Sequence, residues 1–371
     1  MPLYLTDDQQ MLRDTAREFV AEQGSIQNQL RKYRDMNCKD GFGHALWRQF
    51  GELGFTGILI DEADGGLGLG HVEAGIVLEE VGRNLTPSPF LMTSVAAVSA
   101  LKGTAHAARW FPGILAGETV ATLALDEGAK HRPDAVAMRA ERSGNGFRLS
   151  GGKQFVVQGA SADLILTVAR TDEGVTLFAV QRDATGLEVE GMRLADSSIG
   201  ARLRFHGVEV DADAVVGEVG GGEAVLARAL GAARAGASSE LVGVAAGAMD
   251  RTVDYLRQRK QFGRLIGEFQ ALQHRAAHLY SELEIARAAA LKAQQLLDEG
   301  SEEADRMVSV AKAKAGRVST LAVQEGVQMH GGIGMTDEYD IGLYMKRDRV
   351  LNELFGDANY HADRLARLLG Y

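Results

Sequence analysis

Two short stretches of this sequence combine residue types that a packed core does not need. The first, RKQFGRLIGEFQ at 259–270, places an arginine, a Phe-Gly pair and a glutamine at Arg259, Phe262, Gly263 and Gln270. Core packing alone does not require a cation, an exposed-looking aromatic residue and an amide at these offsets. We therefore expect this stretch to hold something other than the chain's own core.

The second stretch, QMHGGIGMTDEYD at 328–340, is rich in glycine. Gly331 and Gly332 allow backbone amides to close on an anion or on another stretch of backbone, and Gln328 adds a side-chain donor. Taken alone, the pattern fits either a helix end followed by a turn or a phosphate contact. His330 by itself is better interpreted as a structural histidine than as a catalyst.

Two further glycine-rich stretches, DGGLGLG at 64–70 and GEVGGGEA at 217–224, could be taken for dinucleotide-binding loops. A dinucleotide loop follows a strand, opens a helix and lies inside a β-α-β unit. Neither stretch has that setting, so we interpret both as turns or linkers.

Composition narrows the class of protein. The 371 residues can bury a substantial core, and their formal charge of −10 argues against a nucleic-acid partner. The single cysteine, Cys38, excludes a disulfide framework and cysteine-based metal sites, and no metal site is predicted. Because the sequence shows no signal peptide and no apolar run of about 18–20 residues, we expect a soluble cytoplasmic protein.

The hydrophobic pattern divides the chain into three predicted domains, at 1–116, 117–222 and 223–371. The first is helical, and Thr6 with Gln9 is predicted to form a capping box at the start of its first helix. The apolar face expected for that helix comprises Met11, Leu12, Ala16, Phe19 and Val20.

The sequence pattern of the middle region predicts an antiparallel sheet. DAVAMRA at 134–140 alternates, Asn145-Gly146 is a strong hairpin dipeptide, and ADLILTVAR, VTLFAV and ARLRFHGVEV are short runs rich in β-branched residues. Successive strands without intervening helices favour antiparallel pairing over parallel pairing.

The last region is helical again, with one apolar seam whose members are four and three residues apart. The seam comprises Leu272, Ala276, Leu279, Leu283, Ala286, Ala290, Ala293 and Leu297. Small residues in such a seam let neighbouring helices approach closely, which predicts a bundle.

The order of these regions and motifs resembles the acyl-CoA dehydrogenase family over essentially the whole chain. Arg-x-x-Phe-Gly followed by Phe-Gln, and then Gln-x-x-Gly-Gly-x-Gly, stand in the family's order. The resemblance implies a mainly α, multi-domain α+β fold with an N-terminal helical domain, a middle antiparallel β domain and a C-terminal four-helix bundle. It also implies FAD, α,β-dehydrogenation of an acyl-CoA thioester, and re-oxidation by an electron-transfer flavoprotein.

The same resemblance implies roles for individual residues. Arg259 would pair with the FAD pyrophosphate, for which a guanidinium is suited because it offers several fixed donors and stays charged. In family members these residues reach across a dimer interface toward the neighbouring subunit's flavin. Arg234 matches a recurrent arginine near the active site, with a bundle ion pair as the alternative. The further cofactor-binding residues would be Phe262, Gln270, Gln328, Gly331 and Gly332.

Other family positions depart from the pattern. In the loop LALDEGAKHRPD at 123–134 and the strand KQFVVQG at 153–159, the residues that usually seat the flavin ring are replaced, with Phe155 for a tryptophan and Val157 for a hydroxyl residue. A valine cannot hydrogen-bond a flavin atom.

The catalytic carboxylate expected from the family is also missing from its usual positions. Near the C-terminus Phe355 is followed by Gly356, and the flanking carboxylates are Glu353 and Asp357, which we take as candidate bases. The alternative family position, just before Arg234, holds an alanine.

Three interpretations follow, and the sequence leaves them open. The chain is a subunit of a heterotetrameric acyl-CoA dehydrogenase whose related partner carries the base. Alternatively it is a self-sufficient homo-oligomeric enzyme with a relocated base, or a flavin-free binding or assembly protein that kept the fold. The segment GMTDEYDIGLYMKR at 334–347 resembles the heteromeric branches more than the straight-chain fatty acyl ones.

Overall fold

A computed structural model describes residues 3–371, and these form two compact units. The first comprises the N-terminal segment up to Arg31, residues His71–Thr86 and residues Arg234–Tyr371, and the second comprises Lys32–Gly70 and Pro87–Ala233. Each unit draws on distant parts of the sequence. The domain boundaries predicted near 116 and 222 therefore stay predictions.

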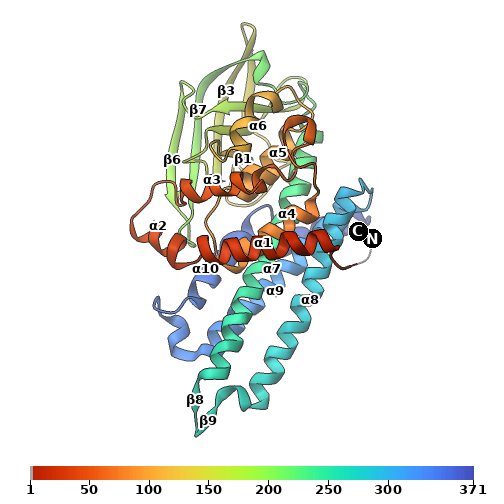
Figure 1. Cartoon of the computed structure of the whole chain (residues 1–371). Coiled ribbons are helices and arrows are strands. Elements are labelled where there is room, and N and C mark those ends of the chain that lie inside the picture. The colour runs from red at the N-terminus through yellow and green to blue at the C-terminus, as the bar shows by residue number, and fades with distance from the viewer. Residues whose placement is uncertain (1–2) are drawn as a thin grey trace. The chain divides into compact units, whose positions relative to one another are not determined.

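The first unit is helical (Figure 1). Its elements are α1 (Asp7–Gln23), η1 (Gln27–Arg31), α4 (His71–Arg83), the second part of α7 (Gly222–Gln258), β8 (Lys260–Gln261), β9 (Arg264–Leu265), η6 (Ile266–Glu268), α8 (Gln270–Asp298), α9 (Ala304–His330), η7 (Gly331–Met335), α10 (Ile341–Glu353) and α11 (Ala358–Leu368).

The predicted capping box is present at α1. The Thr6 hydroxyl accepts from the Gln9 amide and the Gln9 side chain accepts from the Thr6 amide, at 3.3 and 3.0 Å. On the predicted apolar face Ala16 and Val20 are buried, whereas Met11 is 63% exposed, so only part of that face is covered. The helical period sets the direction of a face, whereas its width depends on what packs there.

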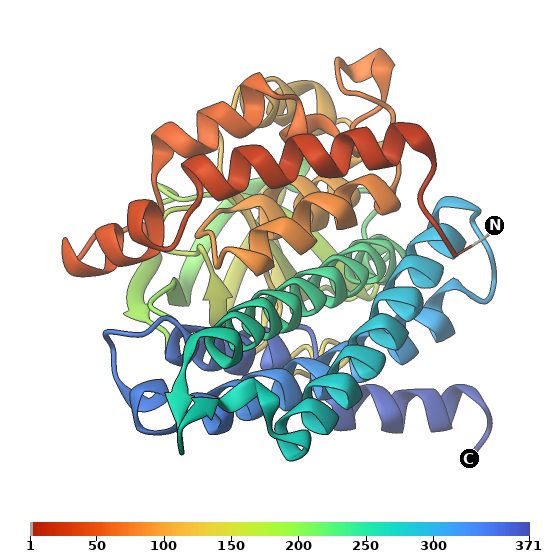
Figure 2. The ribbon, with the colours of Figure 1, turned by 60° about the horizontal axis from the view of Figure 1, so that its bottom comes forward.

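Small residues hold the C-terminal helices together. Ala235 of α7, Ala293 of α8 and Ala311 of α9 lie in one buried cluster, and α8, α9 and α7 run alongside one another in Figure 2. The predicted seam of α8 is buried from Leu279 to Ala293, whereas Leu272, Ala276 and Leu297 are half-buried. The C-terminal helical domain is thus confirmed.

The second unit contains the sheet, with short helices around it. Its helices are α2 (Lys32–Asp35), α3 (His44–Glu52), η2 (Phe55–Gly57), η3 (Glu62–Asp64), η4 (Leu91–Ala97), α5 (Val98–Leu101), α6 (Ala107–Leu115), η5 (Ala212–Ala214) and the start of α7. Its strands are β1 (Ala121–Ala124), β2 (Arg139–Ser143), β3 (Gly146–Val157), β4 (Leu164–Arg170), β5 (Val175–Gln181), β6 (Leu187–Arg193) and β7 (Ile199–Asp211).

The strands pair in the order β1-β4-β2-β3-β7-β6, with β5 also on β4. A hairpin forms where it was predicted, but its turn lies one residue earlier: Ser143 pairs with Gly146, so Gly144 and Asn145 make the turn instead of Asn145 and Gly146. Most pairings are antiparallel as predicted, but β4 runs parallel to β1 and β2. Residues 134–138 precede β2 and are not strand, although their alternation predicted one.

None of the helices in residues 3–371 combines the length and hydropathy needed to cross a membrane. The same residues contain no cluster of three or more His, Cys, Asp or Glu side chains that could hold a metal ion.

Candidate functional site

The Phe-Gly pair forms the tip of a hairpin at the end of α7. Lys260 pairs with Leu265 and Gln261 with Arg264, which leaves Phe262 and Gly263 as a two-residue turn. Both turn residues have positive φ, 53° and 79°. This conformation is natural for glycine but costs a side chain such as phenylalanine about 1–2 kcal/mol. Nevertheless the Phe262 side chain is 91% exposed, so the fold holds an aromatic ring in water at the expense of backbone strain.

Arg259 lies at the base of this hairpin, where its backbone is held by hydrogen bonds and its side chain is exposed. Its amide donates to the Tyr255 carbonyl and its carbonyl accepts from the Ile266 amide, both at 2.9 Å. Its side chain is exposed, and within residues 3–371 its guanidinium forms no ion pair or hydrogen bond. Gln270, the first residue of α8, is exposed as well. The hairpin therefore presents a cation, an aromatic ring and an amide to solvent.

The glycine-rich stretch begins where α9 ends. Gly331 has φ 66° and ψ −144°, a conformation that essentially only glycine adopts. Gly332 has no such need, and a Cβ placed on it would meet no atom within 4 Å. Gln328, in the last turn of α9, is exposed. The chain's own packing thus explains the glycine at 331 but not the one at 332.

This contrast predicts the effect of Gly332→Val. Because nothing crowds position 332, we expect the free energy of unfolding to change by no more than about 0.5 kcal/mol. If a diphosphate closes on this backbone, FAD retention will nevertheless be lost, and Gly332→Ala will have a smaller effect. Thermal denaturation and flavin absorbance of the same preparations check both parts. A stable variant that keeps its flavin would contradict the role of this glycine.

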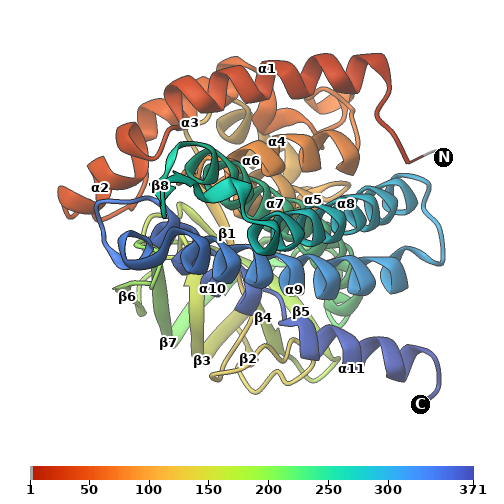
Figure 3. The same cartoon turned by 90° about the horizontal axis from the view of Figure 1, so that it is seen from below.

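The structure brings the hairpin and the glycine turn together. The hairpin and the segment 331–340 lie side by side in all three views (Figures 1, 2 and 3). The Tyr255 ring, beside Arg259, lies 4.5 Å from the His330 ring, which precedes Gly331. Donors from these two segments can therefore act on one ligand. A guanidinium, exposed amides and open backbone glycines are groups that suit a diphosphate.

The predicted base lies in the turn between α10 and α11. Phe355 and Gly356 both have positive φ, 60° and 101°. Asp357 is the N-cap of α11, where its carboxylate accepts from the Tyr360 amide at 2.7 Å. Arg234 is buried and donates through Nε to the Phe355 carbonyl at 3.3 Å. Its Nη2 donates to the Tyr360 hydroxyl at 3.1 Å. Asp357 as a base remains a prediction.

Two further buried side chains hold this turn, a lysine and a neutral histidine. Lys312, whose side chain is 0% exposed, donates to three backbone carbonyls at 3.0–3.2 Å, those of Leu351, Asn352 and Gly356. His361 Nε2 donates to the Phe355 carbonyl at 3.1 Å. Burial, with a smaller contribution from Arg234, lowers the pKa of Lys312 to about 7. Burial beside Lys312 and Arg234 lowers the pKa of His361 to about 2.

The second candidate base, Glu353, pairs with Arg349 at 3.1 Å. Glu353 and Asp357 line one cavity of about 470 Å³ together with Asp348. Asp348 is buried, which raises its pKa, and its carboxylate accepts from Thr320 and Asn352. The structure thus brings the two candidate carboxylates to one cavity, and each has a partner, Arg349 for Glu353 and the Tyr360 amide for Asp357.

In the second unit, the loop at 123–134 is held by its own acidic residues. The Asp126 carboxylate pairs with His131 Nδ1 at 3.0 Å and accepts from the Arg132 amide. The Glu127 carboxylate pairs with Lys153 Nζ at 2.7 Å. Lys153 is buried, which lowers its pKa. These carboxylates maintain the loop's shape.

The strand β3, in which Phe155 was expected to replace a tryptophan, is irregular. The register of β3 on β7 shifts between Lys153 and Val156, and Phe155 in the bulge has φ 52° and is 49% exposed. Val157 is buried, and its carbonyl accepts from Thr122 Oγ1 at 2.6 Å. The bulge therefore turns an aromatic ring outward where the family has one, and leaves no side-chain donor at Val157.

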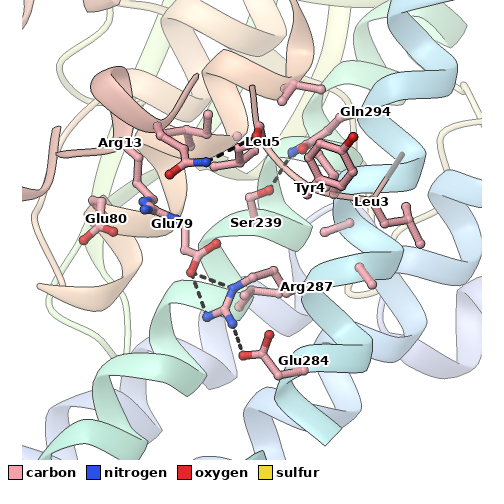
Figure 4. A pocket seen from close by; sticks show the side chains of 18 of the residues that line it. Leu3, Tyr4, Leu5, Arg13, Glu79, Glu80, Ser239, Glu284, Arg287 and Gln294 are labelled. Atoms are coloured by element: carbon pink, nitrogen blue, oxygen red, sulfur yellow. Dashed lines mark hydrogen bonds and ion pairs between the residues drawn. The ribbon is translucent and has the colours of Figure 1, made fainter. Parts of the chain in front are cut away.

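A different cavity, of about 490 Å³, lies in the first unit (Figure 4). Arg287 donates to Glu79 at 2.9 and 3.1 Å and also pairs with Glu284. Arg17 donates to the buried Glu80 at 2.8 Å. The carboxylates of this cavity are thus neutralised by arginines, and the predicted site residues are not among those that line it.

Sequence reasoning missed the residues that support the site, namely Tyr255, Lys312 and His361. Lys312 was detectable because Val308, Lys312, Ala315, Ser319 and Ala322 are four and three residues apart, and all are buried. A lysine on the apolar face of a helix indicates a buried, hydrogen-bonded charge. Tyr255 and His361 carried no comparable signal.

Comparison with known proteins identifies the family. Residues 6–118 match the acyl-CoA dehydrogenase N-terminal domain, 124–208 the middle domain and 220–370 the C-terminal domain. The chain belongs to the acyl-CoA dehydrogenase family. These are oxidoreductases of fatty acid and lipid metabolism, so the resemblance drawn from the sequence is confirmed.

Individual relatives agree with this assignment. Acyl-CoA dehydrogenase FadE12 of Mycobacterium tuberculosis is 31% identical, over 93% of this chain and 91% of the relative. The Tcur3481-Tcur3483 steroid ACAD variant is 31% identical with a TM-score of 0.89, over 98% of both chains. The ChsE4-ChsE5 complex from Mycobacterium tuberculosis is 26% identical with a TM-score of 0.90, over 100% of this chain and 99% of that one.

Proposed function

We propose that this acyl-CoA dehydrogenase chain is an FAD-dependent subunit that completes the cofactor site of a related partner. The observation that carries the proposal is the hairpin tip, where a strained, 91% exposed Phe262 stands beside the uncommitted cation of Arg259. Within the chain the ring has an edge-on contact with Phe269 at 6.2 Å and otherwise faces water, whereas in a subunit that contacts a neighbour's cofactor it would be covered. The open backbone at Gly332 supports the same interpretation.

Within this proposal each segment has a defined task. Arg259 and the amides after Gln328 bind the pyrophosphate, Phe262 packs on the cofactor, and Gln270 hydrogen-bonds it. When bound, the flavin accepts the hydride that leaves the acyl-CoA thioester in α,β-dehydrogenation. An electron-transfer flavoprotein then re-oxidises the enzyme, and the chain acts in the cytoplasm.

The state of the turn at 351–357 supports a partner that carries the base. Asp357 caps α11 and Glu353 pairs with Arg349, so both carboxylates already have partners within the fold. Ala233, before Arg234, has no proton-accepting group. Two of the similar solved structures, Tcur3481-Tcur3483 and ChsE4-ChsE5, are named as pairs of different chains, which favours a heterotetramer.

Co-expression tests the proposal. We expect the chain alone to be colourless, and to become yellow and active when it is co-expressed with a neighbouring family gene whose product has the missing glutamate. Absorbance spectra and acyl-CoA-dependent reduction of a dye measure this. Full flavin and turnover in the chain alone would refute it, and no flavin in either preparation would favour a flavin-free assembly protein.

A second candidate function is a self-sufficient homo-oligomeric dehydrogenase. The shared cavity of Asp357 and Glu353 favours it, because a carboxylate there is positioned beside space for a substrate. Asp357→Asn keeps the helix cap, since asparagine caps as well as aspartate. We expect unchanged turnover of the assembled enzyme, whereas a loss of about 100-fold or more would identify Asp357 as the base.

A further inference from the structure

A cluster of three aromatic rings lies beneath the glycine turn. The ring of His330, the last residue of α9, is stacked on Tyr255 with centroids 4.5 Å apart and planes at 25°. It also contacts Tyr339 at 4.8 Å, and Tyr255 meets Tyr339 edge-on at 5.9 Å. His330 is only 3% exposed. Residues from α7, α9 and the segment before α10 thus share one stack.

The stack connects the hairpin at 259–270 with the glycine turn at 331–340, the two segments proposed to bind the nucleotide. The Tyr255 carbonyl accepts from the Arg259 amide, so the tyrosine lies one helical turn before that arginine. His330 directly precedes Gly331. The ring contact between Tyr255 and His330 is therefore a short physical link between the cation and the glycine amides.

A second contact holds the far side of the same segment. Arg31 donates through Nε and Nη2 to the Asp340 carboxylate, at 3.2 and 2.9 Å. Its Nη2 also donates to the Asp337 carbonyl at 2.7 Å. The segment 331–340 is thus fixed near its end by Arg31 and at its start by the ring stack.

The hydrogen bonding of His330 fixes its ring. Nδ1–H donates to the Gly326 carbonyl at 2.7 Å, so Nε2 is the unprotonated nitrogen of a neutral ring. Within residues 3–371, Nε2 has no hydrogen-bond partner. Burial lowers the pKa of His330 and keeps the ring neutral. A neutral ring can stack on tyrosine without placing an unpaired charge in the protein interior.

We propose that His330 is a positioning residue for the nucleotide, whose stack on Tyr255 holds the glycine turn at a fixed distance from Arg259. This inference rests on the proposed function, because it assumes that a diphosphate contacts both segments. A ligand held by two segments binds more tightly when they are already in place, since less conformational freedom is lost on binding. His330 contributes this pre-organisation without touching the ligand.

The test combines two measurements on His330→Ala, His330→Leu and His330→Phe. Hydrogen exchange of the amides at 331–336 in the chain alone reports the turn without any flavin. FAD titration of the co-expressed enzyme reports binding. We expect the alanine and leucine variants to exchange about tenfold faster and to bind FAD about tenfold more weakly, the upper range for one aromatic pair. Phenylalanine, which restores the stack, should stay within about twofold of wild type in both.

Met335→Ala is the matched control, because Met335 is exposed in the same segment and lies outside the stack. We expect wild-type behaviour from it. Unchanged exchange in both the alanine and leucine variants would overturn the link, and the leucine variant keeps the test valid if alanine unfolds the chain. Faster exchange with unchanged FAD affinity would overturn the positioning role. Absence of FAD from the wild-type enzyme would instead refute the proposed function. The hydrogen-exchange result would still test whether the ring stack fixes the glycine turn.

Discussion

Replacing Arg259 with alanine removes FAD from the assembled enzyme while the helices stay folded. The side chain is exposed and forms no hydrogen bond or ion pair within residues 3–371, so its loss leaves no buried group unpaired. A charge-assisted hydrogen bond to a phosphate contributes about 1.5–3 kcal/mol, and its removal weakens binding about 10- to 150-fold. Flavin absorbance after gel filtration and far-ultraviolet circular dichroism measure the two parts.

Two substitutions test whether Arg259 binds the pyrophosphate through its guanidinium donors or acts only through its positive charge. Arg257→Ala removes another exposed arginine, in the last turn of α7 and two residues before Arg259, and we expect this variant to retain FAD. Arg259→Lys keeps the charge but loses the planar set of donors, so an intermediate affinity is expected. Normal retention in Arg259→Ala would remove the pyrophosphate role, and equal losses in Arg257→Ala and Arg259→Ala would indicate a general charge effect.

Local sequence signals predicted the elements whose stability is local. The capping box at Thr6, the hairpin at Asn145 and the seam from Leu279 to Ala293 depend on residues close in sequence, and all three are present. The parallel pairing of β1 with β4 joins residues more than forty positions apart, as in Ala121 with Leu164. No local pattern encodes that pairing, because both strands are short and apolar along their length.

The candidate site shows the same division. The hairpin and the glycine turn were found because each is a compact motif, but the stack that joins them connects Tyr255 with His330 across the length of α8 and α9. The function of Asp357 could not be read from its type. Only the geometry shows that its carboxylate caps a helix and that hydrogen-bond donors from three helices surround the preceding turn.

The candidate site residues lie in two kinds of surroundings, one exposed to solvent and one enclosed by hydrogen bonds. The surface formed by the hairpin at 259–270 and the glycine turn at 331–340 is open. It has an exposed arginine without an ion pair and an exposed aromatic ring, which suit an external ligand. The turn at 351–357 is closed, because its carbonyls accept from Arg234, Lys312 and His361. Side chains at an open surface can act on a partner, whereas those of the closed turn serve the fold. This division is what a subunit that completes another's site requires.

Lys312→Met therefore acts through stability, and we expect a loss of about 2–4 kcal/mol in the free energy of unfolding. Methionine is a flexible side chain of similar length, but it leaves the carbonyls of Leu351, Asn352 and Gly356 without their donor. An unpaired buried acceptor costs about 1–3 kcal/mol, and partial relaxation of the turn offsets some of the sum. Lys314→Met on the same helix removes a half-exposed partner of Glu282 and should cost less than about 1 kcal/mol.

The pH dependence of this stability loss shows whether burial lowers the pKa of the Lys312 amine. The pKa of Lys312 is about 7 in the fold, against 10.5 for an ordinary lysine. Burial and the nearby Arg234 lower this pKa, whereas the carboxylates of Asp357, Asp348 and Glu353 raise it. Between these values the unfolded chain holds a proton that the folded chain does not, so wild-type stability rises with pH by about 1.4 kcal/mol per unit. The methionine variant lacks this slope, and its deficit should grow from pH 7 to pH 9 in chemical denaturation. A deficit that stays constant over that range would mean that the pKa of Lys312 is not lowered by burial and that its side chain remains an ammonium in the fold.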